Sequence, residues 1–338
     1  MLIRISGSEF YTGVEKVIPN TGRMLVNFKV DGMVLHVQLI GNIITESEID
    51  ILEKESGNDL DITVTLTPSI LLINKAEDVY LDLLPDILNV RQNRYSLSVT
   101  KEWESRVELP EWDDEKAVDF NEKEFKDIVS KTRALDSVAH FIKEPLANLT
   151  FFNGYCYCEY SNIILRVKTD IGNFTISAET ARNLQKLLDV KCRCIVDKSR
   201  GLLYIKTKYK LISAMISPVN LQRVDAKEKR VDDLKFYTDT SFAGKSEDID
   251  ALVRVYKAAK VTINMTKDKM GLTVTDGKHT FTYGDRMIPD KSMSFTINHL
   301  NALNKLFNAE EGVNVLIGGN LLCWRKERIT LLVAGTLY

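Results

Sequence analysis

The sequence lacks the features that mark most enzymes and membrane proteins. No apolar run is long enough to span a membrane, and the first residues, MLIRISGSEFYT, lack the basic segment and apolar core of a secretory signal. There is no phosphate-binding loop, no His-Glu-x-x-His motif and no Ser/His/Asp pattern, and the few histidines are scattered. These absences favour a protein of the cytoplasm that is not an enzyme and that needs no cofactor.

Cysteine is scarce and odd in number, with five residues, which suggests a reducing compartment. Four of them form two C-x-C pairs, Cys156 with Cys158 and Cys192 with Cys194. Zinc ligands are usually spaced C-x2-C in turns, whereas YCYCEY and KCRCIV alternate as strands do, which puts each pair on one sheet face. We therefore expect buried thiols in preference to the alternative, a metal site.

Excess charge of either sign is also missing. The chain has 45 Lys and Arg against 47 Asp and Glu, a net charge of −2, which excludes a protein that is basic over its whole surface. At 338 residues and 44% hydrophobic content, the chain is long and apolar enough for two or three domains with real cores.

What is present is one pattern repeated three times: an amphipathic helix, a strand-rich stretch, a second amphipathic helix and paired strands. Phe10, Phe125 and Ile249 open the apolar faces of the first helices and lie 115 and 124 residues apart. The spacing predicts first helices in 8–17, 123–136 and 249–260, second helices in 69–78, 178–189 and 299–308, and domains at 1–105, 118–217 and 234–338. Chance repetition within an α+β chain is the alternative.

Between the helices, LHVQLIGNIIT, LRVKTDIGNFTIS and LTVTDGKHTFTYG share an L-x-V start and a glycine. We expect Gly41, Gly172 and Gly277 to permit the positive φ of a tight hairpin. Two polar connectors, at 101–119 and 217–234, separate the copies. The first carries Trp103 and Trp112, which we expect to pack the connector onto a neighbouring repeat.

Three passages carry a resemblance that covers nearly the full chain. NRYSLSV followed by VELPEWDD, then LRVKTDIGNF, then SPVNLQRV are similar in order and distance to passages of the three-domain bacterial sliding DNA clamp, the ring-shaped polymerase processivity factor. The chain departs from that pattern in its shorter length, in the inserted Ile171, in a hairpin without the family's histidine and arginine, and in its AGTLY end. A divergent, phage-encoded clamp would explain these departures.

The resemblance implies an α+β fold of three clamp-type domains, each with two helices packed on antiparallel sheets. It also implies a homodimeric ring that encircles duplex DNA without reading sequence, and peptide motifs through which a DNA polymerase and a clamp loader bind. The helices would line the hole. The six predicted helices carry a net charge of +2 and the remainder −4, and the candidate DNA-facing residues are Lys126, Lys131, Arg133, Arg182, Lys186, Arg254, Lys257, Lys260 and Lys305.

Members of this family also hold partner peptides in an apolar pocket between their second and third domains. The matching positions here are Thr169, Asp170, Gly172, Asn173, Phe174, Pro218, Arg223, Val224, Val333, Leu337 and Tyr338. For Val333 and Leu337, a place in a strand core is the alternative.

Two other functions stay open on the sequence. A monomeric clamp-like processivity factor would bind DNA without closing, and it would need a more basic face than this chain has. A structural assembly protein could use the same repeat without a positive, helix-lined interior. A particle with a central hole would separate the clamp from both.

Overall fold

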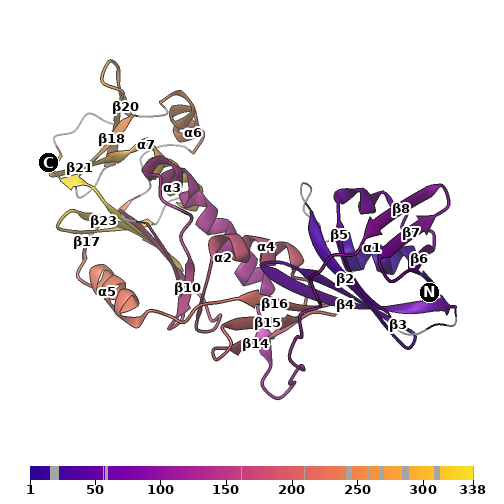
Figure 1. Ribbon diagram of the computed structural model, residues 1–338. Coiled ribbons are helices and arrows are strands. Elements are labelled where there is room, and N and C mark those ends of the chain that lie inside the picture. Colours follow the sequence, from indigo (N-terminus) through magenta and orange to yellow (C-terminus); the bar gives the residue numbers. More distant parts are fainter. Residues whose placement is uncertain are drawn as a thin grey trace. The chain divides into compact units, whose positions relative to one another are not determined.

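The computed structural model describes residues 1–15, 23–55, 57, 60–160, 162–208, 210–240, 246–256, 259–266, 270–283, 289–307 and 313–337. It divides into two compact units, Met1–Glu122 with Arg182–Ser217 and Lys123–Ala181 with Pro218–Tyr338. Figure 1 shows the helices and strands of each unit. None of the described helices is long and apolar enough to cross a membrane.

One order of elements recurs along the chain. The first third contains β1 (Leu2–Ile5), α1 (Gly7–Glu15), β2 (Met24–Asp31), β3 (Val34–Ile40), β4 (Ile43–Lys54), β5 (Asp61–Leu66), the 3-10 helix η1 (Pro68–Leu72), β6 (Val79–Leu83), β7 (Ile87–Gln92) and β8 (Tyr95–Thr100). The middle third contains β9 (Val118–Phe120), α2 (Glu122–Thr132), η2 (Arg133–Leu135), α3 (Asp136–Ile142), β10 (Leu149–Phe152), β11 (Tyr155–Tyr160), β12 (Ile163–Lys168), β13 (Phe174–Ile176), α4 (Ala178–Leu187), β14 (Cys192–Asp197), β15 (Leu202–Lys206) and β16 (Leu211–Met215).

A connecting helix, α5 (Leu221–Asp232), leads to the last third. This part contains β17 (Lys235–Thr240), α6 (Ser246–Val255), β18 (Lys260–Met265), β19 (Met270–Thr275), β20 (Thr280–Tyr283), β21 (Lys291–Thr296), α7 (Ile297–Phe307), β22 (Val313–Gly318), β23 (Leu321–Lys326), β24 (Ile329–Ala334) and β25 (Thr336–Leu337). Each third thus runs strand, helical segment, four strands, helical segment, three strands, and the last third adds the short β25. The repeated order is confirmed, while the three predicted domain boundaries stay a prediction.

The sheets are antiparallel, and two of the three join strands of different repeats. The first unit holds a 12-stranded sheet along the path β8-β7-β6-β1-β4-β16-β15-β14-β9, joined by β2, β3 and β5. The second unit holds an 8-stranded sheet, β13-β10-β11-β12-β24-β23-β22-β17, and a 5-stranded sheet, β20-β19-β18-β21-β25. Helices packed on antiparallel sheets confirm the predicted α+β class.

Each core forms where an apolar helix face meets the alternating inner face of a sheet. In the first unit, Phe10 of α1 stacks on Phe28 of β2 with ring centroids 6.3 Å apart. In the second, Phe151 of β10 lies 6.0 Å from Phe125 of α2 and 4.9 Å from Phe174 of β13. All five rings are at most 1% exposed, so they contribute heavily to apolar burial.

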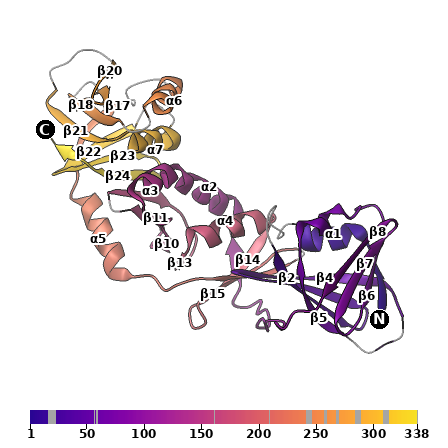
Figure 2. The same ribbon diagram turned by 45° about the horizontal axis from the view of Figure 1, so that its top comes forward.

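The 8-stranded sheet of the second unit has helices on both faces. Because side chains alternate along a strand, Leu165 and Ile164 of β12 point to opposite faces. Ile164 forms a cluster with Val231 of α5, Leu234 and Leu332 of β24. Figure 2 shows α2 and α3 on one face of these strands and α5 on the other.

One predicted helix is wrong, and one helix was not predicted. In place of the predicted helix at 69–78 there is only η1, because Ile73 is already extended and the backbone of Asn74 bonds to a side chain. Gln92 Oε1 accepts from the Asn74 N–H at 2.7 Å, and Gln92 Nε2 donates to the Asn74 carbonyl at 2.8 Å. The helix α5 was not predicted either, although Leu221, Val224 and Val231 have helical spacing.

The three glycines do not occupy equivalent turns. Gly277 has a φ of +91° in the β19–β20 turn, but Gly41 and Gly172 do not have positive φ. Gly41 and Gly277 each follow the second strand of their four-strand segment, whereas Gly172 follows the third, β12. The shared L-x-V pattern therefore marks strands in general and not one hairpin.

The two tryptophans of the first connector have opposite environments. Trp112 packs as expected, with the Lys206 ammonium 5.5 Å from its ring. Trp103 is 101% exposed, so the prediction that it packs is wrong. The connector is held instead by polar contacts: Gln38 donates to the Val107 carbonyl at 2.9 Å and accepts from the Val107 N–H at 2.8 Å.

The predicted burial of the thiols is confirmed. All five cysteines are buried and free of disulfides. Burial raises the pKa of Cys194 to about 11 and that of Cys323 to about 12. Both thiols therefore stay protonated at neutral pH and behave as small apolar groups.

Buried His299 predicts a loss of stability in acid. The residue is 1% exposed in α7, and burial lowers its pKa to about 4 from the usual 6.5. Between these values the unfolded chain binds a proton that the folded chain refuses, so stability falls as the pH drops below 6.5. At pH 5 we expect a loss of about 2 kcal/mol from this residue, measured by urea unfolding at pH 7 and pH 5.

The matched variants are His299→Gln and His279→Gln, because His279 is an exposed histidine. His299→Gln should remove this part of the pH dependence and His279→Gln should leave it. An unchanged pH dependence in His299→Gln would contradict the assignment.

Candidate nucleic-acid interface and partner site

A group of packed helices in the second unit supplies the first candidate surface. α7 contacts α6, α3 and η2. Asn301 Nδ2 of α7 donates to Ser137 Oγ of α3 at 3.3 Å, and Asn304 Nδ2 donates to Asp250 Oδ1 of α6 at 3.0 Å. Because the buried side of α7 faces these neighbours, Lys305 is left exposed.

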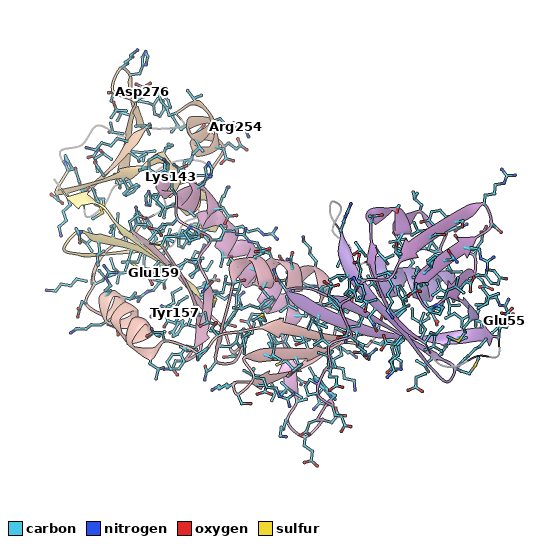
Figure 3. All side chains as sticks on the ribbon, viewed as in Figure 1. Glu55, Lys143, Tyr157, Glu159, Arg254 and Asp276 are labelled. Carbon is cyan, nitrogen blue, oxygen red and sulfur yellow. The ribbon has the colours of Figure 1, made fainter. Side chains whose placement is uncertain are left out.

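Most of the predicted DNA-facing cations of this unit reach solvent. Arg133 of η2, Arg254 of α6, Lys305 of α7 and Lys260 at the start of β18 are exposed, and Lys126 of α2 is half-buried. Figure 3 shows Arg254 on α6. Lys257 lies outside the described residues.

Lys131 differs, because it takes part in an ion-pair cluster on α2. Its ammonium pairs with Asp127, which also pairs with Arg328 from the β23–β24 turn; Arg328 Nη1 lies 3.3 Å from Glu124 Oε1 as well. Burial works against ionisation of Asp127, but Lys131 and Arg328 outweigh it and hold the pKa of Asp127 below its usual value. No sequence signal pointed to Arg328, because it lies 201 residues from Asp127.

The two remaining predicted cations lie on α4, which is divided between the units. Ser177 caps this helix: its Oγ accepts from the Thr180 N–H at 3.0 Å. Lys186 in the last turn is exposed and Arg182 is half-buried. An acceptor at the first turn and a lysine at the last are both favourable for the helix dipole.

The predicted peptide site centres on the loop between β12 and β13. Asp170, Gly172 and Asn173 are exposed. Thr169 is buried, with its N–H donating to the Gly154 carbonyl at 2.8 Å and its Oγ1 accepting from the next-but-one N–H at 3.2 Å. Phe174, which follows the loop, lies in the core against Phe151. The exposed part of the loop is therefore polar, and the aromatic ring next to it is buried.

Strand register separates Val333 from this loop. β12 and β24 pair with Val167 opposite Ile329 and Ile163 opposite Val333. Val333 therefore lies at the far end of the strand pair from Thr169, about 20 Å away along β12. It is 0% exposed, which agrees with the strand-core alternative.

The other predicted pocket residues are spread along the second connector and the C-terminal segment. Pro218 is exposed, and Val224 of α5 is 1% exposed. Arg223 lies in α5 and Leu337 in β25, but their side chains, and all of Tyr338, are outside the described residues. The structure thus gathers only the loop residues of this site.

The described residues of the two surfaces do not form a metal centre. Among the residues that the structure describes, no three His, Cys, Asp or Glu side chains are placed to hold a metal ion. The cations and the polar loop described above offer ionic and hydrogen-bond contacts, which suit phosphate groups and a peptide.

Comparison with known proteins finds similarity in structure but not in sequence. The chain matches no protein-family model and no curated protein sequence. In structure it is similar to a putative DNA polymerase III beta subunit from Eubacterium rectale, with a TM-score of 0.75 and 11% identity over 99% of both chains. It is also similar to the DNA polymerase sliding clamp of Pseudomonas aeruginosa, with a TM-score of 0.73 and 10% identity over 99% of both chains.

A third solved structure, the DNA polymerase beta subunit of Streptococcus pyogenes, gives a TM-score of 0.73 at 11% identity over 99% of this chain and 100% of that one. Each of the three matches covers 99% of this chain. The chain therefore has the fold of the bacterial DNA polymerase sliding clamps, the beta subunits of DNA polymerase III.

Proposed function

We propose that this chain is a sliding clamp: a non-enzymatic subunit that closes with a second copy into a ring around duplex DNA in the cytoplasm and tethers the replicative polymerase. The observation that carries the proposal is that two of the three sheets continue from one repeat into the next. In the first unit β4 pairs with β16, and in the second unit β12 pairs with β24. Each time, the third strand of a four-strand segment joins the last strand of the following repeat.

The same rule leaves one strand unmatched at each end of the series. The third strand of the last repeat is β20, and the last strand of the first repeat is β8. Both end the strand order of their sheets within the described residues, and beyond β8 there is only an isolated bridge from Lys101 to Val64 of β5. Pairing β20 of one copy with β8 of another would repeat the joint and satisfy both backbone edges. Two copies would then close a ring of six repeats with twofold symmetry.

The side chains of these two edges support the same joint. Tyr95, Leu97 and Val99 on one face of β8 are half-buried and pack against the core of the first unit. Phe281 of β20 stands opposite Val274 of β19, so both lie on the buried face of their sheet. A β20–β8 joint with matched faces would cover the open sides of both clusters.

Binding to DNA follows from topology and from modest positive charge. A ring that slides must contact phosphates without gripping bases, so its intrinsic affinity is weak and falls with salt. The exposed cations Arg133, Arg254 and Lys305 suit this role, together with Lys186 and Lys260. Lys131 contributes less, because Asp127 neutralises it.

Tethering requires a site for a short segment of the polymerase or of the clamp loader. The residues of the proposed site that the structure leaves exposed are Asp170, Gly172 and Asn173 of the loop and Pro218 of the second connector. An extended peptide could bond to their backbone while its apolar side chains pack beside them.

The first prediction of this proposal concerns the ring. Light scattering should give a particle of twice the chain mass of 38.4 kDa, and electron microscopy should show a central hole. Phe281→Asp should weaken association at least tenfold, because a carboxylate would be buried in an apolar seam. Thr282→Asp is the control, since its side chain lies on the opposite face of β20.

A wild-type chain that stays monomeric with and without DNA would overturn the closed ring in favour of a monomeric processivity factor. A dimer that Phe281→Asp and Thr282→Asp weaken equally would reject the face assignment of the joint.

The second prediction concerns the cations. Replacing Arg133, Arg254 and Lys305 by glutamine should lower the affinity for duplex DNA about tenfold and reduce the salt slope by up to about 3, one per lost phosphate contact. Fluorescence anisotropy of labelled DNA at several salt concentrations measures both quantities. The effect should not depend on DNA sequence.

The matched control removes three exposed cations at or near α5, which lies on the other face of the 8-stranded sheet: Lys229→Gln, Arg230→Gln and Lys235→Gln. This variant should bind DNA nearly as the wild type does. Equal losses in both triple variants would show that DNA does not prefer the helical face.

A further inference from the structure

A cavity of about 550 Å³ lies in the first unit at the end of β8. Its walls come from β5, from the β6–β7 turn and from the start of the first connector. The lining residues are Asp61, Thr63, Asp86, Thr100, Lys101, Glu102, Trp103, Glu104 and Ser105. The site is separate from the helical face and from the loop between β12 and β13.

Two properties of this cavity favour binding of a positively charged group of another molecule. The lining includes four acidic residues, Asp61, Asp86, Glu102 and Glu104, and a single lysine, so the cavity favours a cation. Beside them, Trp103 presents its whole indole to water at 101% exposure. A large aromatic surface gains free energy when it is covered, and its π face also attracts an ammonium group.

The backbone before Trp103 is held by hydrogen bonds. The Lys101 N–H donates to the Asp86 carbonyl at 2.9 Å, and the Glu102 N–H donates to the Thr63 carbonyl at 2.7 Å. Glu102 Oε1 also accepts from Thr65 Oγ1 at 2.6 Å. The backbone that leads into Trp103 is therefore held by the β6–β7 turn on one side and by β5 on the other.

We infer that this cavity receives the β19–β20 turn of a second copy of the chain, with Lys278 entering between the carboxylates and Trp103. The inference rests on the proposed ring, and it adds a specific contact that would fix the register of the joint.

The position follows from antiparallel pairing. Both joints within the chain are antiparallel, so in a β20–β8 joint the start of β20 lies beside the end of β8. If the buried faces match, Phe281 stands opposite Val99 or Leu97, because a shift of one residue would reverse the faces. In either register the turn before Thr280 lies next to residues 100–103.

The chemistry of the turn fits the cavity. Asp276 Oδ1 accepts from the backbone N–H groups of Lys278 at 2.9 Å and His279 at 2.7 Å, so this carboxylate is occupied within its own turn. Gly277 allows the reversal with a φ of +91°. The turn thus projects Lys278 into solvent, and Figure 3 shows Asp276 at its tip.

A double-mutant cycle tests the contact in the full chain. Lys278→Glu and Glu104→Lys should each weaken dimerisation about tenfold, because each places like charges together, and the double variant should recover most of the loss. Analytical ultracentrifugation measures the dissociation constants. Lys143→Glu, which reverses an equally exposed lysine of the second unit (Figure 3), should leave the constant within about twofold.

Trp103 provides a second readout. The difference in acrylamide quenching between the wild type and Trp103→Phe isolates this indole. At protein concentrations above the dimer dissociation constant the indole should be protected from acrylamide, and at concentrations below it the indole should be accessible.

The outcomes separate this inference from the proposed function. A stable dimer in which Trp103 stays accessible, or in which the two reversals add without recovery, would overturn the inference and leave the ring intact. A wild type that forms no dimer would overturn both.

Discussion

The backbone hydrogen bonds that join one repeat to the next are the constraint on which the rest of the structure depends. At the first joint Ile43–Glu46 pairs with Leu211–Ala214, and at the second Ile163–Val167 pairs with Ile329–Val333. Each pairing fixes which residues face the helices, because a slip of one position would turn every side chain over. A repeat is therefore not a free module: its sheet is completed by its neighbour, and both compact units contain residues of more than one repeat.

The same joint sets the charge of the candidate DNA-facing surface. The Lys168 N–H at the end of β12 donates to the Arg328 carbonyl at 2.8 Å, which brings the β23–β24 turn beside α2. Arg328 can then pair with Glu124 and Asp127. Arg328 and Lys131 thus share the carboxylates of Asp127 and Glu124, and the four charges of this cluster balance. The charge of this face therefore depends on strand register as well as on helix composition.

Sequence reasoning succeeded where the physical signal is local. Helical spacing of apolar residues located α1, α2, α4, α6 and α7, and alternation in YCYCEY and KCRCIV identified strands with buried thiols. It failed where a distant partner decides. The helix predicted at 69–78 does not form, because the backbone of Asn74 bonds to the side chain of Gln92. Trp103 was expected to pack on a neighbouring repeat and is exposed. For the candidate sites, the sequence could predict which single residues are exposed. It could not predict that Val333 lies far from Thr169, because that separation depends on the register between β12 and β24.

The connecting helix α5 has a consequence for the behaviour of the protein in solution. Without it, Ile164, Leu316 and Leu332 would form an apolar patch on the outer face of a sheet, next to Cys323. Contiguous apolar surface of this kind promotes aggregation. By laying Val231 and Leu234 over these residues, the connector removes this apolar surface from water. A connector of the same length without those two apolar residues would span the distance and still leave a protein prone to precipitate.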